Sequence, residues 1–110
     1  MKNLLVALLL LSFSAFADVD KKTERTFKAK CSACHGVDGK GQTEKGRKMK
    51  IVDFTSPEFK KKSDTELKKA ITDGVDKKVE GVEKIMDPYK DELTPEQIDS
   101  LVRLIRSLGT

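Results

Sequence analysis

Histidine, cysteine and tryptophan are scarce in this chain of 110 residues, which contains one His, two Cys and no Trp. A structural zinc site normally takes four Cys or His ligands, whereas Cys31, Cys34 and His35 supply only three. A zinc site of that kind is therefore excluded. Aromatic residues make up only 5% of the chain, so it can bury only a modest apolar core, and domains of this size are marginally stable on their own.

The chain also lacks a strong charge excess and a long hydrophobic run. Its formal net charge is only +4 at pH 7, and no clustered basic stripe accompanies it, so no nucleic-acid partner is predicted. The apolar stretch from Leu4 to Leu11 is shorter than the about 20 residues that a membrane-spanning helix needs. We therefore expect no membrane anchor in the mature protein.

The N-terminus has the pattern of a cleaved signal peptide. Lys2 precedes the apolar stretch, and Ala15 and Ala17 place small residues at the two positions that a signal peptidase reads. Cleavage after Ala17 would leave a chain that starts at Asp18 and would lower the net charge from +4 to +3. We expect residues 1–17 to be a signal peptide and residues 18–110 to be one periplasmic domain.

The sequence Cys31-Ser32-Ala33-Cys34-His35 is a C-x-x-C-H motif, which attaches c-type haem covalently. Residues three and four apart share one helix face, so both thiols and the imidazole can face one flat ligand. The thiols would form thioethers to the porphyrin vinyl groups, and the imidazole would bind the iron through one nitrogen. The alternative is a redox-active dithiol, which usually follows a strand, and the sequence shows no convincing strand.

Helices separated by glycine-punctuated connections are expected along the mature chain. The predicted helices cover about residues 20–34, 63–73 and 94–108, and a capping box opens each of the last two. The connection over about residues 36–62 is long for a compact domain, and wrapping around a haem would explain its length. The last helix carries an apolar stripe that we interpret as packing surface: Ile98, Leu101, Val102, Ile105 and Leu108.

The second axial position of the iron must be filled by Met or Lys or stay vacant, because His35 is the only histidine. A methionine thioether is a soft ligand that suits haem iron. Met49 and Met86 are the candidates once the signal peptide is removed. Met49 follows the attachment motif closely and is expected on the same side of the ring as His35. Met86 lies on a Pro-bearing segment ahead of the last helix and can close over the opposite face, which favours Met86.

The mature chain resembles the small monohaem c-type cytochromes of the cytochrome c family over its whole length. The matching segments occur in the family's order at about its usual spacing: Cys31-Ser32-Ala33-Cys34-His35-Gly36, Asp38-Gly39-Lys40-Gly41, Asp53-Phe54, Ser63-Asp64-Thr65-Glu66-Leu67, Ala70-Ile71-Thr72-Asp73-Gly74, Met86, and Leu93-Thr94-Pro95-Glu96-Gln97-Ile98 leading into the last helix.

This resemblance implies an all-α cytochrome c fold, with three to five helices wrapped around one covalently attached haem c. The N- and C-terminal helices would cross near the haem. Cys31 and Cys34 would carry the thioethers, His35 would be the proximal iron ligand and Met86 the distal one. The function implied is one-electron transport, without enzymatic chemistry, between transient redox partner proteins in the periplasm.

Three positions depart from the family's common pattern. Asp87 follows the candidate ligand Met, where relatives often have Pro directly. Leu104 replaces the aromatic residue by which the last helix commonly packs on the first, which leaves Phe27 without an aromatic partner. Val52 stands where many relatives have a Pro whose carbonyl accepts the N–H of the proximal histidine, and the Val52 carbonyl is expected to take that role.

Two other functions remain as alternatives. One is a haem subunit docked permanently in a larger oxidoreductase, and the other is a haem protein with an open sixth site and peroxidase-like or ligand-binding activity. For a diffusible carrier, lysines near the haem-bearing loops would steer the protein toward an acidic partner, although they would equally fit a solvated face. These lysines are Lys45, Lys48, Lys50, Lys77, Lys78 and Lys84.

Overall fold

The computed structural model describes the backbone of residues 15–110 and the surroundings of side chains from residue 21 onward. Residues 1–14, which hold most of the predicted signal peptide, lie outside this range, and its cleavage stays a prediction. Over the described residues, no helix is both long and apolar enough to cross a membrane.

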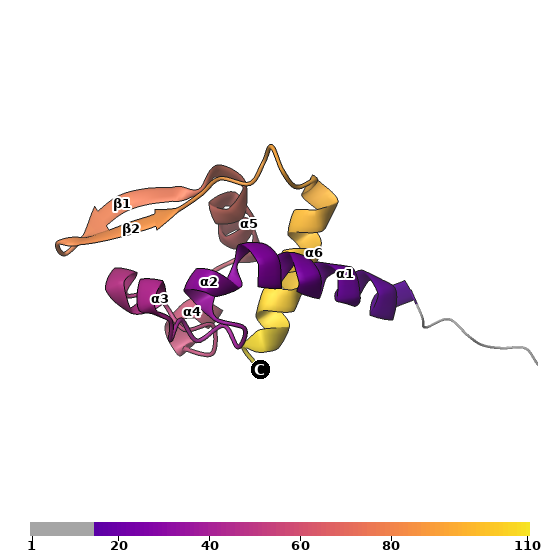
Figure 1. Cartoon of the computed structure of the whole chain (residues 1–110), viewed down its shortest axis with the longest axis horizontal. Coiled ribbons are helices and arrows are strands. Elements are labelled where there is room, and N and C mark those ends of the chain that lie inside the picture. Colours follow the sequence, from indigo (N-terminus) through magenta and orange to yellow (C-terminus); the bar gives the residue numbers. More distant parts are fainter. Residues whose placement is uncertain (1–14) are drawn as a thin grey trace, which may run out of the picture.

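The described chain contains helices and one two-stranded antiparallel sheet, formed by consecutive strands (Figure 1). In order, the elements are α1 (Ala15–Lys30), α2 (Ser32–His35), α3 (Glu44–Met49), α4 (Pro57–Lys60), α5 (Asp64–Asp73), β1 (Val75–Val79), β2 (Val82–Met86) and α6 (Pro95–Leu108).

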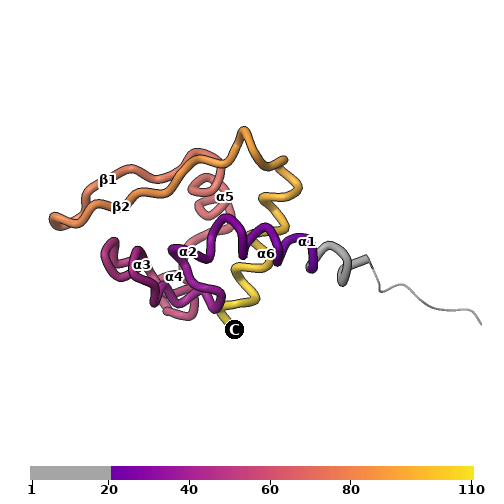
Figure 2. Tube along the Cα trace, in the orientation of Figure 1, coloured from indigo at the N-terminus to yellow at the C-terminus, as the bar shows by residue number. Residues whose placement is uncertain are grey.

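The terminal helices α1 and α6 cross at the centre of the molecule, and α5 packs beside α6 (Figures 1 and 2). The capping box of α6 is present as predicted: Thr94 accepts a hydrogen bond from the amide of Gln97, whose side chain accepts one from the Thr94 amide. The stripe of α6 faces the core, where Leu101 and Val102 are almost completely buried. The crossing and the packing role of α6 are therefore confirmed.

Helix α5 begins and ends where the sequence predicts. Ser63 and Glu66 form its capping box, and Gly74 terminates it in a backbone conformation with φ of 78°. Leu67 and Ile71 are the buried residues of this helix, one turn apart. They join a core made of the following buried side chains: Phe27, Phe54, Phe59, Leu67, Ile71, Leu93, Ile98, Leu101, Val102 and Ile105.

The expected lack of an aromatic partner for Phe27 is wrong. Its ring meets the ring of Phe54 edge to face, with 6.4 Å between the centroids, and Phe54 in turn packs 4.6 Å from Phe59. Leu104 is partly buried against the same core. The long connection after the attachment motif thus contributes the aromatic residue that the last helix lacks.

That connection is more regular than predicted, because residues 36–62 include the short helices α3 and α4. Thr43 caps α3 by accepting a hydrogen bond from the amide of Gly46, and Ser56 caps α4 by accepting one from Phe59. Pro57 occupies the first helical position of α4, where its missing N–H costs nothing. These capping residues were visible signals in the sequence, but the helices are too short to show an apolar period.

The hairpin β1–β2 is the main departure from the all-α prediction. Val79 pairs with Val82, and the two-residue turn between them places both Glu80 and Gly81 at positive φ, 51° and 82°. This conformation is that of a type I′ turn, whose twist suits a hairpin. The segment that carries Met86 is therefore one strand of a hairpin. The strand ends at Met86, and Pro88 follows it.

Candidate functional site

The C-x-x-C-H motif forms a single helical turn that continues α1 after a small irregularity at Cys31. The amide of Cys31 still donates to the carbonyl of Phe27 at 2.8 Å, and the amide of His35 donates to the carbonyl of Cys31 at 3.0 Å. Cys31 and Cys34 are free thiols, not joined to each other. The structure therefore brings the three predicted residues of the motif onto one turn, which is what two thioethers and one axial ligand require.

The imidazole of His35 is half-buried and packs on an aromatic ring. Its ring stacks on Phe54 with 5.1 Å between centroids, and its Nδ1 atom is buried without a hydrogen-bond partner among the described residues. The expected hydrogen bond from the imidazole to the Val52 carbonyl is not formed through Nδ1. Burial lowers the pKa of the imidazole, so the ring is neutral near pH 7 and can bind a metal.

Cys31 is a partly buried thiol beside the core. Burial raises its pKa to about 11, against a smaller lowering by the charge of Lys30 and a further raising by Cys34. The thiol is thus neutral at physiological pH, and it packs against the same hydrophobic core as Met86. A low thiol pKa is the usual property of a reactive redox dithiol, so the environment of Cys31 does not favour that alternative.

Helix α3 packs directly on the attachment turn. The hydroxyl of Thr43 donates to the carbonyl of Cys34 at 2.7 Å. Gly46 allows this close packing, because a Cβ atom there would lie 2.6 Å from the Cys34 carbonyl and 2.3 Å from that of Gly41. The amide of Gly41 also donates to the carbonyl of His35 at 2.8 Å. The glycine-rich segment after the motif therefore packs closely against the last two residues of the motif, Cys34 and His35.

Met86 lies at the end of β2, paired with Val75, and its half-buried side chain contacts the hydrophobic core. The chain that follows it is tied back to the rest of the domain at Tyr89. The Tyr89 amide donates to the carbonyl of Ile71 at 2.9 Å, and its hydroxyl donates to the carbonyl of Lys30 at 3.2 Å. The segment after Met86 is thereby linked to the residue that precedes Cys31.

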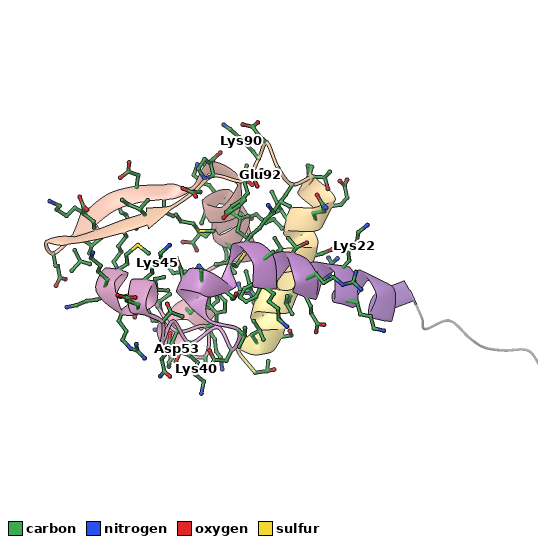
Figure 3. All side chains as sticks on the ribbon, viewed as in Figure 1. Lys22, Lys40, Lys45, Asp53, Lys90 and Glu92 are labelled. Carbon is green, nitrogen blue, oxygen red and sulfur yellow. The ribbon has the colours of Figure 1, made fainter. Side chains whose placement is uncertain are left out.

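An ion pair supports that link from the outside. Lys30 and Glu92 approach to 2.8 Å, and Figure 3 places Glu92 on the connection between the hairpin and α6. Both side chains are largely exposed, so the pair itself contributes little to stability. The ion pair does, however, link the connection before α6 to the end of α1.

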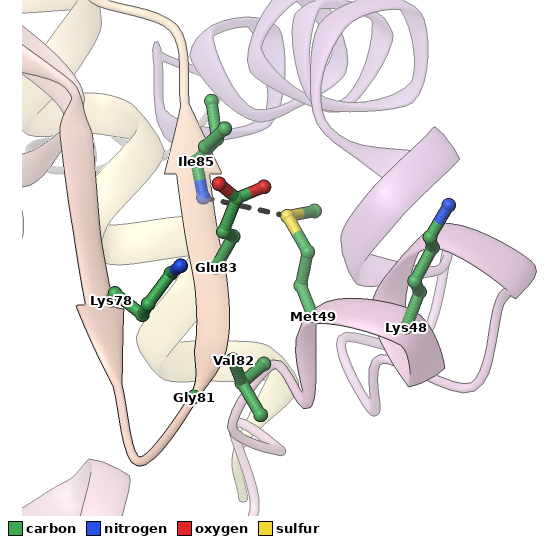
Figure 4. Close-up of a pocket in the computed structure, with 7 residues that line it drawn as sticks. All are labelled: Lys48, Met49, Lys78, Gly81, Val82, Glu83 and Ile85. Atoms are coloured by element: carbon green, nitrogen blue, oxygen red, sulfur yellow. Dashed lines mark hydrogen bonds between the residues drawn. The ribbon is translucent and has the colours of Figure 1, made fainter.

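Met49, the competing methionine, is the last residue of α3 and also lies beside β2. Its sulfur accepts a hydrogen bond from the amide of Ile85 at 3.4 Å (Figure 4). Among the described residues, Met86 but not Met49 packs against the hydrophobic core that Cys31 contacts. The two methionines are thus close to the same strand, and contact with the core distinguishes them.

A cavity of about 400 Å³ opens between α3 and the hairpin. Figure 4 shows its lining: Lys48, Met49, Lys78, Gly81, Val82, Glu83 and Ile85. None of the four predicted haem residues lines it, so we interpret the cavity as a space beside the site, at the side of Met49.

The lysines expected to steer a partner fall into two groups. Lys45, Lys48, Lys50, Lys77 and Lys78 are exposed, and Figure 3 labels Lys45 beside α3, on the side of the hairpin. Lys84 instead is half-buried, and its ammonium group donates to the backbone carbonyls of Met49 and Lys50. This difference was not predicted, because the sequence shows no clear signal for the strand that carries Lys84.

The sequence model of the family "Cytochrome c" matches residues 21–109. A solved structure titled "KustC0563 c-type cytochrome" is similar, with 29% identity and a TM-score of 0.66 over 80% of this chain and 98% of that one. A solved structure of a Kustc0563 point mutant is similar with 31% identity and a TM-score of 0.63 over 78% and 96% of the two chains. No curated protein matches. The chain therefore belongs to the cytochrome c family, whose members hold covalently bound haem c and use it in electron transfer.

Proposed function

We propose that this protein is an exported, periplasmic electron carrier with one haem c, attached through Cys31 and Cys34 and bound axially by His35 and Met86. One observation carries the proposal. The turn that presents both thiols also presents a neutral imidazole with a buried, unpartnered ring nitrogen. When bound, the haem supplies one-electron redox chemistry at its iron. The residues present fit such a group, since two thiols on one turn can form thioethers to the porphyrin, and imidazole nitrogen and methionine sulfur are donors that suit haem iron.

The protein's own residues would hold the group in place and keep water from the iron. Phe54 supports the imidazole by stacking, and its ring is almost fully buried. Met86 would approach from β2, which is hydrogen-bonded to the end of α3, and the chain after the strand is held at Tyr89, which restrains the sulfur. A rigid ligand set favours electron transfer, because little has to rearrange when the charge of the iron changes.

Absorption spectra test the assignment of the second ligand. Ferric haem with a methionine ligand has a weak band at the red end of the visible spectrum. We expect this band in the purified wild type, its loss in Met86→Ala and its retention in Met49→Ala. The opposite pattern in the two variants would assign Met49. Fast binding of carbon monoxide or cyanide to the wild type would favour an open sixth site instead.

We further propose that the carrier meets its partners transiently and that its exposed lysines favour acidic ones. The support is the exposure of Lys45, Lys48, Lys50, Lys77 and Lys78. Rates of reduction by an acidic redox protein should then fall as ionic strength rises, because salt screens such steering. A rate independent of salt would reject it. Gel filtration with native partners distinguishes a diffusible carrier from a permanently docked subunit.

A further inference from the structure

We propose that Lys84 is a positioning residue for Met86. It would act through a latch between β2 and the end of α3, made of Lys84 and Ile85 on the strand and Met49 and Lys50 on the other side. This inference depends on the function proposed above, in which Met86 is an axial ligand.

The latch consists of three hydrogen bonds. The ammonium group of Lys84 donates to the carbonyl of Met49 at 3.0 Å and to that of Lys50 at 2.8 Å. The amide of Ile85 donates to the sulfur of Met49 at 3.4 Å. The last carbonyls of a helix find no donor within the helix, so a charged donor satisfies two groups that would otherwise need water.

Lys84 and Met86 share one face of the strand. Along β2 the side chains of Val82, Lys84 and Met86 are half-buried, whereas those of Glu83 and Ile85 are exposed. Residues two apart in a strand point the same way, so a contact that fixes Lys84 also fixes the direction in which Met86 points. The exposed lysine Lys78, on the neighbouring strand, has no hydrogen bond or ion pair of this kind among the described residues.

The other side of the latch is tied to the attachment turn. Helix α3 is held on Cys34 by the hydroxyl of Thr43 and by the close packing of Gly46. A short series of contacts therefore runs from Cys34 through α3 to Lys84 and then to Met86. Because Cys34 and Met86 would contact the same haem, this series sets how far apart the two are held. The hairpin's position over α3 is visible in Figure 1.

Binding of imidazole to the ferric holoprotein measures how firmly Met86 is held, because imidazole must displace it from the iron. Replacing Lys84 by Leu removes the charged donor, keeps an aliphatic side chain and adds no sulfur that could bind the iron. We expect imidazole affinity to rise about tenfold in Lys84→Leu, from the loss of a hydrogen bond to a charged group, and the red band to weaken. Lys84→Arg should retain most of the wild-type behaviour. Lys78→Leu is the matched control for charge and should leave the imidazole affinity and the red band unchanged.

Lys84→Gln provides a second reading if Lys84→Leu fails to accumulate as holoprotein. Unchanged imidazole affinity in Lys84→Leu or Lys84→Gln would overturn the proposal, even if the melting temperature fell, because that result would show a structural role alone. An equal rise in Lys78→Leu would also overturn it. If Met86→Ala kept the red band, the ligand assignment itself would be wrong, and this outcome is separate from failure of the latch.

Discussion

Gly74 joins α5 to β1, and its backbone passes unusually close to the segment around Met86. A Cβ atom at this position would lie 2.6 Å from the Met86 carbonyl oxygen and 2.8 Å from the nitrogen of Pro88. The residue also has a φ of 78°, which side chains rarely adopt. Two independent properties of one residue thus serve the placement of the proposed ligand.

Gly74→Ala should therefore destabilise the protein and disturb the ligand. We expect a loss of about 2 kcal/mol or more in the free energy of unfolding, from backbone strain together with the collision. Gly81→Ala is the matched control, because Gly81 has a similar φ of 82° but open space around it. Denaturant unfolding of both variants measures the difference, and the red band reports on Met86. Equal losses in the two variants would contradict a role for the close approach.

Asp53 supports Phe54, the residue on which His35 stacks. One carboxylate oxygen of Asp53 accepts hydrogen bonds from the amide and the hydroxyl of Thr55, both at 2.7 Å. These bonds lower the pKa of the carboxyl below its ordinary value, the amide bond of Thr55 first and its hydroxyl bond second. The charged form is thus favoured by folding, and the turn that holds Phe54 is stabilised by it.

The pH dependence follows from the sign of this shift. The stabilisation by Asp53 is fully present above the carboxyl's unfolded-state pKa and is lost as pH falls through the lower folded-state value. The melting temperature of the wild type should fall more between about pH 6 and about pH 3 than that of Asp53→Asn, which cannot titrate. Parallel melting curves at the two pH values test this. An identical fall in both proteins would show that the charge of Asp53 does not matter.

The positions of individual residues were predicted best where they depend on local spacing, whereas the haem-binding roles of these residues stay predictions. Cys31, Cys34 and His35 need only one helical turn, and the motif encodes that turn by itself. The partner of Phe27 and the surroundings of Lys84 depend on contacts with segments far along the chain. Such contacts leave no local sequence pattern, so they could not be predicted from the sequence.

Elements with strong caps were predicted best among the helices and strands. The capping boxes of α5 and α6 locate both helix starts, because each satisfies backbone groups that the helix leaves free. The hairpin was not predicted, because its turn and its strands carry only weak sequence signals. Its turn contains Glu80 in place of the Asn or Asp that usually precedes Gly in such turns. Half of its strand residues are also charged, and β1 is exposed over four of its five residues.

Glu80 is a weak point of the hairpin that one substitution should relieve. A φ of 51° is costly for Glu and much less so for Asn, which adopts the left-handed region readily. We expect Glu80→Asn to stabilise the protein by about 0.5 kcal/mol, since Asn-Gly is the preferred type I′ turn. Thermal unfolding measures the effect, with Glu83→Asn as the control for loss of a strand carboxylate. A lower melting temperature in Glu80→Asn alone would contradict this account of the turn.

At the scale of the whole molecule, the hydrophobic core lies to one side of the proposed haem site. The buried apolar residues belong mainly to α1, α5, α6 and the connection around Phe54. The hairpin and α3 contribute none of these buried hydrophobic side chains, and they meet each other through the latch and the cavity beside it. The hairpin and α3 are thus held mainly by hydrogen bonds and bury little apolar surface of their own, which a large apolar ligand would supply.

Loss of haem should therefore unfold much of the domain. A group that binds only the folded chain stabilises it, and here that group would also supply apolar surface that the small core lacks. We expect the variant Cys31→Ala/Cys34→Ala, purified without haem, to show a broad, weakly cooperative thermal transition. The wild-type holoprotein should melt sharply, as circular dichroism or calorimetry can measure. Alanine fits a helix well, so the substitutions themselves should not destroy the attachment turn. A sharp melt of the haem-free variant at the holoprotein's melting temperature would contradict the expectation. It would mean that protein contacts alone hold α3 and the hairpin in place.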